Sequence, residues 1–403
     1  MSNYDYLILT VQSWGTPIGT NSRDIARALA RKSRVLLIDP PLDWASLFKR
    51  GNQKVDYQRR AIREHRGNRL VEVEPNLWVF YPKVTLNSIN WLPDNALFDW
   101  LNHRNNALLA KDIRWALRQL NMSEYVLFND TEMFRGFYLK ELLNPALYVY
   151  YIRDNTLAVD YWRRHGERLE PALIRKSDLT VANSAYLTAM AAQYSSNAVD
   201  IGQGCDLSQF VADAPYEEPA DLAAIPYPRI GYTGAIISMR LDSALLESVA
   251  QQRPDWHLVL VGPEDDAFRA SRLHQLPNVH FLGTKSIDDI PAYVQAFDVL
   301  INPQVVNSIT IGNYPRKVDE YLAMGKPVVA VRTEAMDMFR GHVLLADSPT
   351  QFVDCLERAL TNRMPSSVTE RIRFAHGHSW ENCVDAMKHA IDHTTNATEE
   401  ILR

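Results

Sequence analysis

The chain has 403 residues, of which 46% are hydrophobic and 23% charged, and its formal net charge is -5. One hydrophobic core rarely serves a chain of this length, so we expect two domains of roughly 200 residues each. The negative charge argues against a general nucleic-acid binder. No stretch reaches the roughly 20 apolar residues that span a bilayer, and residues 1–5 lack the pattern of a secretion signal. Since Cys205, Cys355 and Cys383 are odd in number and far apart, we expect a cytoplasmic protein.

A basic stretch, residues 42–69, departs from this acidic average. Eight basic residues there outnumber three acidic ones, which gives eight minus three, or +5: Lys49, Arg50, Lys54, Arg59, Arg60, Arg63, Arg66 and Arg69 against Asp43, Asp56 and Glu64. Trp44, Leu47 and Phe48 lie at its start. Basic residues beside aromatic ones can lie on an anionic surface, here the inner face of the cell membrane. An ordinary solvated loop and helix is the alternative interpretation.

The first half of the chain alternates short apolar runs with helical patterns, which predicts a parallel sheet covered by helices. The expected strands are residues 6–11, 35–38, 125–128, 147–152 and 179–181. Helical patterns occupy residues 22–31 and 95–120.

A polar stretch that contains Pro215, Pro219, Pro226 and Pro228 marks a domain boundary. We place the first domain at residues 1–212, a linker at 213–227 and the second domain at 228–378. The alternation then restarts with strands expected at residues 229–233, 258–261, 279–282 and 299–302. Each of these runs is followed at once by a glycine or a proline, and ligands of open α/β sheets bind beyond such strand ends. A last helix is expected from Ser379 onward.

Residues 313–331 are the most informative segment. Pro315 stands where a helix can begin, and apolar residues then recur on one helical face. Gly325 ends the helix, and residues 328–331 have the pattern of a short buried parallel strand.

The start of this helix is a candidate anion site, because free N–H groups and the helix dipole point toward it. Lys317 lies in the first turns, within reach of a phosphate. Glu320 follows one turn later and suits a ribose diol. The alternative is an ordinary amphipathic helix.

Four segments, in this order, resemble the donor domain of glycosyltransferases with the two-domain GT-B fold, especially the family-four-like (group 1) members. They are residues 231–235 (Gly-Tyr-Thr-Gly-Ala), 259–263 (Val-Leu-Val-Gly-Pro), 277–283 (Pro-Asn-Val-His-Phe-Leu-Gly) and 313–331. The resemblance covers residues 228–336. The first half is similar mainly at residues 201–206 (Ile-Gly-Gln-Gly-Cys-Asp).

This resemblance implies an α/β protein with two Rossmann-like domains that face a cleft. It also implies that the C-terminal helix, residues 379–403, crosses back to the N-terminal domain. The implied donor substrate is a nucleotide-diphosphate sugar such as a UDP-sugar, with no further cofactor.

Transfer from such a donor requires stabilisation of the leaving diphosphate by amides, helix dipoles and cations. Glycine, here Gly234, lets the backbone come close to phosphates. Two residues are candidate cations, and Lys317 is the better of them. Arg240, the other, has a solvated arginine as its alternative reading. The expected donor-binding residues are Thr233, Gly234, Arg240, Asn313, Tyr314, Lys317 and Glu320. Because the sequence has no Asp-x-Asp pattern, we expect no metal site.

The chain departs from the family-four pattern at Gly312, where that pattern has a second glutamate. The departure leaves the donor sugar and the stereochemical course open. The arrangement around Lys317 is instead similar to that of xanthan-type glucuronosyltransferases, which carry an aspartate after an N-terminal strand in a Tyr-x-x-x-Asp setting. Tyr150 and Asp154 have this spacing.

A carboxylate at such a strand end can take the proton of an acceptor hydroxyl. We therefore expect Asp154 to be the catalytic base of an inverting transfer. A helix N-cap, or a salt bridge to Arg153, is the alternative role for Asp154. Asp39 and Asp130 also follow predicted strands and are competing candidates.

The long loop after the first strand contains Trp14, Gly15 and Gly19. In the resembling fold, this loop lines the acceptor side. Trp14 can stack on a sugar face, or it can be a packing tryptophan.

The leading hypothesis is a glycosyltransferase that uses a nucleotide sugar and a saccharide or lipid-linked acceptor in the synthesis of a cell-surface polysaccharide or glycolipid. A nucleotide-sugar 2-epimerase on the same fold is the alternative enzyme, although it would need cleft carboxylates and histidines that the sequence does not cluster. A non-catalytic scaffold of the same fold is the third possibility.

Overall fold

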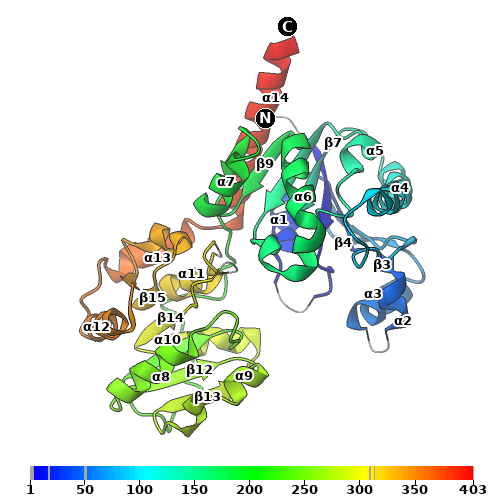
Figure 1. Cartoon of the computed structure of the whole chain (residues 1–403). Coiled ribbons are helices and arrows are strands. Elements are labelled where there is room, and N and C mark those ends of the chain that lie inside the picture. Colours follow the sequence, from blue (N-terminus) through cyan, green and yellow to red (C-terminus); the bar gives the residue numbers. More distant parts are fainter. Residues whose placement is uncertain (1–3, 17–18, 50–51, 308–309, 313, 403) are drawn as a thin grey trace. The chain divides into compact units, whose positions relative to one another are not determined.

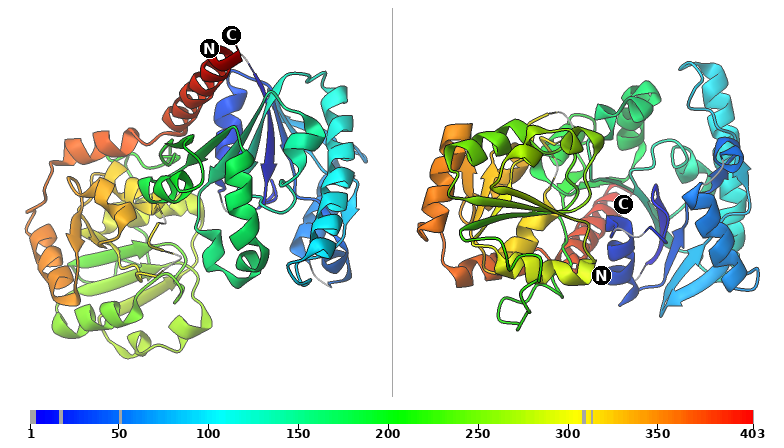
Figure 2. Two further views of the ribbon diagram at one scale, coloured as in Figure 1. Left: turned by 45° about the horizontal axis from the view of Figure 1, so that its top comes forward. Right: turned by 90° about the horizontal axis from the view of Figure 1, so that it is seen from below.

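The structure is a computed structural model that describes residues 4–16, 19–49, 52–307, 310–312 and 314–402. It divides into two units (Figures 1 and 2). Unit 1 consists of residues 1–202 and 383–403, and unit 2 of residues 203–382. The chain therefore passes from unit 1 to unit 2 and returns to unit 1 with its last helix. Among the described helices, none is long and apolar enough to cross a membrane.

Unit 1 is built on an eight-stranded sheet in the order β10-β9-β8-β7-β1-β2-β5-β4. All neighbouring strands are parallel except β4 and β5. The strands are β1 (Asp5–Thr10), β2 (Val35–Ile38), β4 (Leu70–Glu74), β5 (Leu77–Phe80), β7 (Tyr125–Asp130), β8 (Leu147–Ile152), β9 (Leu179–Ala182) and β10 (Ala198–Asp200). A separate pair joins β3 (Leu42–Asp43) to β6 (Thr85–Leu86).

Helices cover this sheet because alternate strand residues are apolar on both faces. One face packs against α4, α5, α6 and α7 through residues such as Leu109, Leu139, Leu173 and Leu187. The helices of unit 1 are α1 (Asn21–Ala30), α2 (Trp44–Phe48), α3 (Gln53–Glu64), α4 (Ala96–Gln119), α5 (Leu139–Leu143), α6 (Asp160–Lys176) and α7 (Ala185–Ala192), with a short 3-10 turn, η1 (Thr156–Ala158).

The last helix, α14 (Trp380–Leu402), contributes its residues from Cys383 onward to unit 1. Val384, Met387 and Ile391 are buried. The amide of Asn197 donates a hydrogen bond to the Thr394 hydroxyl at 3.2 Å. These contacts attach the C-terminal end of the chain to the N-terminal sheet.

Unit 2 contains a six-stranded parallel sheet in the order β13-β12-β11-β14-β15-β16. Its strands are β11 (Arg229–Thr233), β12 (His257–Val261), β13 (Val279–Gly283), β14 (Val299–Asn302), β15 (Val328–Val331) and β16 (Leu344–Ala346). Its helices are α8 (Ser243–Gln252), α9 (Asp266–Arg269), α10 (Ile290–Ala296), α11 (Arg316–Ala323), α12 (Pro349–Leu360) and α13 (Val368–His376), with 3-10 turns η2 (Arg272–Gln275), η3 (Ile287–Asp289) and η4 (Glu334–Phe339).

Alternation along the unit 2 strands divides its core into two layers. Leu258 and Leu260 point into one layer with α8 and α12, whereas Val259 and Val261 point into the other with α10 and α11. The predicted α/β architecture with parallel sheets is therefore confirmed. The predicted strands at residues 229–233, 299–302 and 328–331 have the bounds of β11, β14 and β15.

The segment that we expected to be a linker, residues 213–227, packs on unit 2. Leu222 and Ile225 are buried in the layer that contains α11. The buried guanidinium of Arg229 donates to both of their carbonyl oxygens at 2.8 Å. The boundary lies at Gly202–Gln203 rather than at residue 212, because these apolar side chains find their partners in the second sheet.

Candidate functional site

Three consecutive strands of unit 2 end in glycines with positive φ angles. Gly234 follows β11 (φ 127°), Gly262 follows β12 (φ 149°), and Gly283 ends β13 (φ 67°). A side-chain carbon added to Gly262 would lie 1.9 Å from the carbonyl oxygen of Gly234. The two turns are in such close contact that only glycine fits at this edge of the sheet.

Lys317, in the first turn of α11, lies directly against this edge. A carbon added to Gly234 would be 2.7 Å from the Lys317 Nζ. The ammonium group donates to the Tyr232 hydroxyl and lies 3.8 Å from the centroid of the Tyr232 ring. The backbone turn, the lysine and the tyrosine thus form one contact, assembled from β11 and α11.

The pKa of Lys317 is lowered to about 7, chiefly by burial; Glu320 opposes this shift, and the positive charge of Arg240 contributes to it. Arg240 is exposed, and its positive charge acts on Lys317, which makes it the second candidate cation for this edge of the sheet. Two cations beside a glycine turn form a site for a polyanion. An anion bound there would restore the charged state of the lysine.

Glu320 lies one turn after Lys317 and is partly buried. Burial raises its pKa, whereas Arg316 and Lys317 lower it. Arg316, which the sequence patterns did not single out, is therefore a third cation near the start of α11. Its guanidinium carbon lies 5.8 Å from the centroid of the Trp380 ring.

The remaining predicted donor residues are engaged in positioning α11. The Thr233 N–H donates to the Tyr321 hydroxyl at 2.9 Å. Tyr321 therefore attaches α11 to the end of β11. The Tyr314 hydroxyl is buried and donates to Asp319 at 2.6 Å. His378 Nδ1 lies 2.8 Å from the other oxygen of Asp319. Asn313, also predicted at this site, lies outside the described residues.

The three candidate bases of unit 1 differ in their surroundings. Asp39 is fully buried, and its oxygens accept from Ser13 Oγ and Trp14 N, both at 2.7 Å. Asp130 is fully buried and pairs with the Arg153 guanidinium at 2.9 Å. Asp154 follows β8 and is only partly buried. Arg153 therefore makes its close ion pair with Asp130, and Asp154 is the most accessible of the three carboxylates.

The acceptor-side loop folds onto α1 and α3. The guanidinium carbon of Arg27 lies 5.4 Å from the centroid of the Trp14 ring. A carbon added to Gly15 would overlap the Tyr57 ring at 1.7 Å, so the loop needs a glycine there. Gly19 is exposed. Trp14 has a packing contact, and its partly buried ring stays a candidate for sugar stacking.

Comparison with known proteins identifies the second unit. Residues 228–362 match the family described as "Glycosyl transferases group 1". These residues contain all three glycine turns together with Lys317, Arg240 and Glu320. This segment of the chain is a group 1 glycosyltransferase domain.

A protein similar to this chain is TuaH of Bacillus subtilis (strain 168), which is named as a putative glycosyltransferase of teichuronic acid biosynthesis. The two are 29% identical over 164 residues, which are 38% of this chain and 40% of the relative. The match thus spans less than half of the length of that protein.

Solved structures show that the chain has the GT-B fold over nearly its whole length. Sucrose-phosphate synthase from Thermosynechococcus elongatus superposes with a TM-score of 0.66 at 16% identity, over 98% of this chain and 100% of that one. Anabaena HepE, in complex with UDP and glucose, superposes with a TM-score of 0.61 at 16% identity, over 97% and 100% of the two chains.

The desolvated ammonium of Lys317 predicts a measurable cost in stability. Its pKa is about 7 in the folded protein and near the ordinary 10.5 in the unfolded chain. Between these pKa values the unfolded chain binds more protons than the folded protein, so the free energy of unfolding rises with pH across this window. Below pH 7 the full cost of burying the charged lysine is present. We expect Lys317→Met to be more stable than the wild type at pH 6, with a difference that shrinks toward pH 10.

Urea unfolding at a series of pH values measures this difference. Lys83→Met, which removes an exposed lysine of unit 1, is the control and should show no comparable trend. A Lys317→Met variant that is no more stable than the wild type at pH 6 would contradict the desolvation of this lysine.

Proposed function

We propose that this protein is a glycosyltransferase that moves a sugar from a nucleotide-diphosphate sugar to a saccharide or lipid-linked acceptor in the synthesis of a cell-surface polysaccharide. The observation that carries this proposal is Lys317, held beside the glycine turn of β11 and within the electrostatic influence of Arg240. The HepE complexes with UDP and with UDP-glucose support a uridine nucleotide as the donor. The name of TuaH supports a polysaccharide as the product.

In the proposed reaction, the acceptor oxygen bonds to the anomeric carbon while the bond from that carbon to the diphosphate breaks. The leaving diphosphate gains negative charge. Lys317 and Arg240 stabilise this charge. The developing negative charge also raises the pKa of Lys317 and so favours its ammonium form. Glu320, one turn further along α11, holds the ribose hydroxyls.

We assign the acceptor proton to Asp154. An acceptor hydroxyl is a weak nucleophile, and a carboxylate within hydrogen-bond reach takes its proton as the new bond forms. The partial exposure of Asp154 supports this role over Asp39 and Asp130, which are fully buried. A single displacement with such a base inverts the configuration at the anomeric carbon.

Neither of the two other functions considered from the sequence is favoured by the comparisons. The matched family is described as glycosyl transferases, and so is the TuaH relative. A 2-epimerase would interconvert nucleotide sugars without an acceptor, and a scaffold would bind them without turnover.

Incubation with a panel of labelled nucleotide sugars, with and without saccharide acceptors, tests the proposed function. We expect transfer that depends on the acceptor. We also expect transfer to survive a chelator such as EDTA, because Lys317 and Arg240 supply the positive charge. Interconversion without acceptor, or binding without turnover, would overturn the proposal, and a strict need for manganese or magnesium would contradict its electrostatic part.

The variant Asp154→Asn tests the assignment of the base. It keeps the shape of the side chain and removes its basicity, so we expect turnover to fall about 100-fold or more. Nucleotide affinity, measured by calorimetry with UDP, should stay unchanged because Asp154 belongs to unit 1 and the donor residues to unit 2. Asp385→Asn, on the exposed side of α14, is the control. Normal turnover in Asp154→Asn, or a product with retained configuration, would refute the assignment.

We further propose that unit 1 contacts anionic lipid reversibly through α2 and α3. Trp44 and Phe48 are 50% and 80% exposed, and their rings stack at 6.3 Å. The basic side chains Lys49, Arg59, Arg60, Arg63 and Arg66 are exposed nearby in the sequence. Arg50 and the side chain of Lys54 lie outside the described residues. The combination of exposed rings and cations is typical of a segment that binds a membrane surface.

Vesicle co-sedimentation checks this proposal. Each basic residue near an anionic surface contributes about 1 kcal/mol, so binding should require anionic lipid and fall as salt is added. The double variant Trp44→Ser with Phe48→Ser should bind more weakly at every salt concentration. Equal binding to neutral and anionic vesicles would contradict the proposal.

A further inference from the structure

Unit 1 contains a cavity of about 790 Å³ that none of the predicted site residues lines. It opens among α2, the segment of residues 86–91, α4 and the start of α6. Its volume is within the range of small-molecule sites, roughly 300–1,000 Å³. Aromatic rings form much of its wall: Trp91, Phe98, Phe134, Tyr161 and Trp162.

Helix α4 turns three asparagines, in addition to apolar residues, toward its buried side. Asn102, Asn105 and Asn106 are all buried, although an amphipathic helix normally places apolar side chains there. Asn105 has partners in the protein, since it accepts from Asn87 N at 3.0 Å and donates to Asn87 O at 3.0 Å. Asn106 donates to the carbonyl oxygen of Phe134 at 3.0 Å. These two amides hold the cavity wall together.

Two amide atoms on residues that line the cavity have no hydrogen-bond partner among the described residues, namely Asn102 Nδ2 and Asn90 Oδ1. Their orientations follow from their other atoms, because Asn102 Oδ1 accepts from Asn106 at 3.3 Å and Asn90 Nδ2 donates to Tyr161 O at 2.8 Å. Asn102 is only 2% exposed, so its amide is removed from bulk solvent. An unpaired buried amide is costly, and a ligand hydroxyl can both accept from Asn102 and donate to Asn90.

The charges that line the cavity cancel. Three basic residues, Lys49, Arg135 and Arg164, meet three acidic ones, Asp43, Glu132 and Asp160. Arg135 pairs with the buried carboxylate of Glu132. Arg164 donates to the carbonyl oxygens of Asn90 and Trp91 at 3.3 and 3.1 Å. The cavity therefore suits a neutral ligand better than a phosphate or a uronate, and its amides suit hydroxyl groups better than a hydrocarbon chain.

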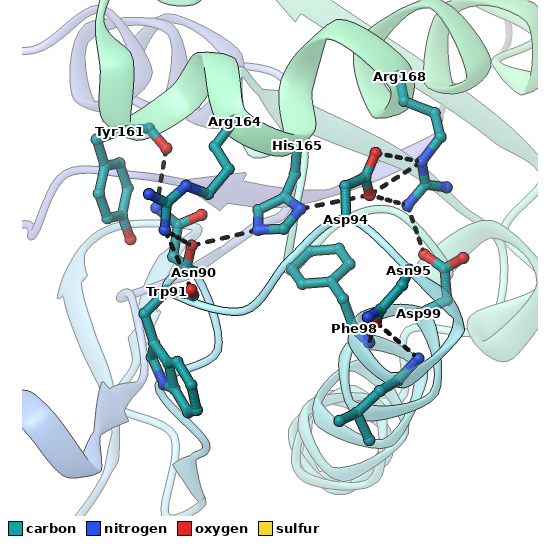
Figure 3. Close-up of polar contacts among 11 residues, drawn as sticks. Asn90, Trp91, Asp94, Asn95, Phe98, Asp99, Tyr161, Arg164, His165 and Arg168 are labelled. Carbon is teal, nitrogen blue, oxygen red and sulfur yellow. Dashed lines mark hydrogen bonds and ion pairs between the residues drawn. The ribbon is translucent and has the colours of Figure 1, made fainter.

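A buried histidine fixes this wall before any ligand binds (Figure 3). The His165 ring stacks on Phe98 with centroids 3.7 Å apart. Its two nitrogens lie 3.4 Å from the Asp94 carboxylate and 3.2 Å from the carbonyl oxygen of Asn90. Arg168 pairs with Asp94 at 2.6 Å and with Asp99 at 2.7 Å. Helix α6 thus holds the Asn90 segment and the start of α4 in place, which lowers the ordering cost of binding.

We propose that this cavity binds a neutral sugar unit of the acceptor, distinct from the unit that receives the transferred sugar. The aromatic rings offer apolar faces to the C–H side of the sugar ring, while Asn102 and Asn90 pair with its hydroxyls. Asp154 does not line the cavity but precedes the lining residue Asp160 by six residues, which an extended chain spans in about 20 Å, so an oligosaccharide acceptor can reach both. That the bound sugar belongs to the acceptor rests on the proposed function, whereas the binding of a saccharide in this cavity does not.

The first test measures glycan binding without any nucleotide sugar, on an array that carries neutral, uronic-acid and phosphorylated oligosaccharides. We expect the wild type to bind neutral oligosaccharides. Asn102→Leu should reduce this binding at least tenfold without loss of thermal stability, because it removes an unpaired donor and leaves Asn106 Nδ2 with two carbonyl acceptors. A wild type that binds only anionic glycans, or none, would overturn the proposal, as would unchanged binding by Asn102→Leu.

A pair of exposed tryptophans provides a matched comparison. Trp91 lines the cavity and is 70% exposed, whereas Trp100 is 59% exposed on α4 and does not line it. We expect Trp91→Ala to weaken glycan binding and to raise the KM for acceptors of two or more sugars, with kcat and the KM for a monosaccharide acceptor unchanged. Trp100→Ala should resemble the wild type. Equal effects of the two variants, or an equal rise in KM for monosaccharides, would overturn the cavity assignment while leaving transfer itself intact.

Discussion

The contact between Lys317, Tyr232 and the Gly234 turn is the interaction on which the candidate donor site depends. It requires an ammonium group to lie against an aromatic ring and a bare backbone, with little water around it. Such a contact costs stability in the free protein, because desolvation disfavours the charged lysine. The cost is tolerable only if the surroundings hold the lysine in place and an anionic ligand recovers the charge.

The surroundings meet the first condition through buried hydrogen bonds that fix α11. Tyr321 attaches the helix to the end of β11, and Asp319 attaches it to Tyr314 and His378. The glycines after β11 and β12 provide the bare backbone that this contact requires, since any side chain at Gly262 would collide with the Gly234 carbonyl. The site is therefore a property of several elements that pack together and not of one motif.

Unit 1 also contains a locally unfavourable arrangement, here of uncharged groups. Natural sequences place locally unfavourable features where function needs them, and an unpaired amide in a cavity is such a feature. The family match covers residues 228–362 and so lies within unit 2, whereas the solved neighbours share the fold over nearly the whole chain at low identity. Side chains of unit 1, which recognise the acceptor in our proposal, are free to differ from those of the neighbours while the sheet beneath them stays the same.

The sequence by itself determined five of the six strands of the second unit, the helix that carries Lys317 and Glu320, and the group 1 resemblance. These features depend on local patterns, such as a four-residue buried run for β15 or a glycine after β11, and local patterns survive in any tertiary context. Only the tertiary structure decided that Lys317 contacts Tyr232 and that Tyr321 contacts Thr233, because these partners are 85 and 88 residues apart in the chain. It also decided which aspartate of unit 1 stays accessible. The cavity of unit 1 was not predictable for the same reason: the asparagines of α4 look like an ordinary polar helix face until packing buries them.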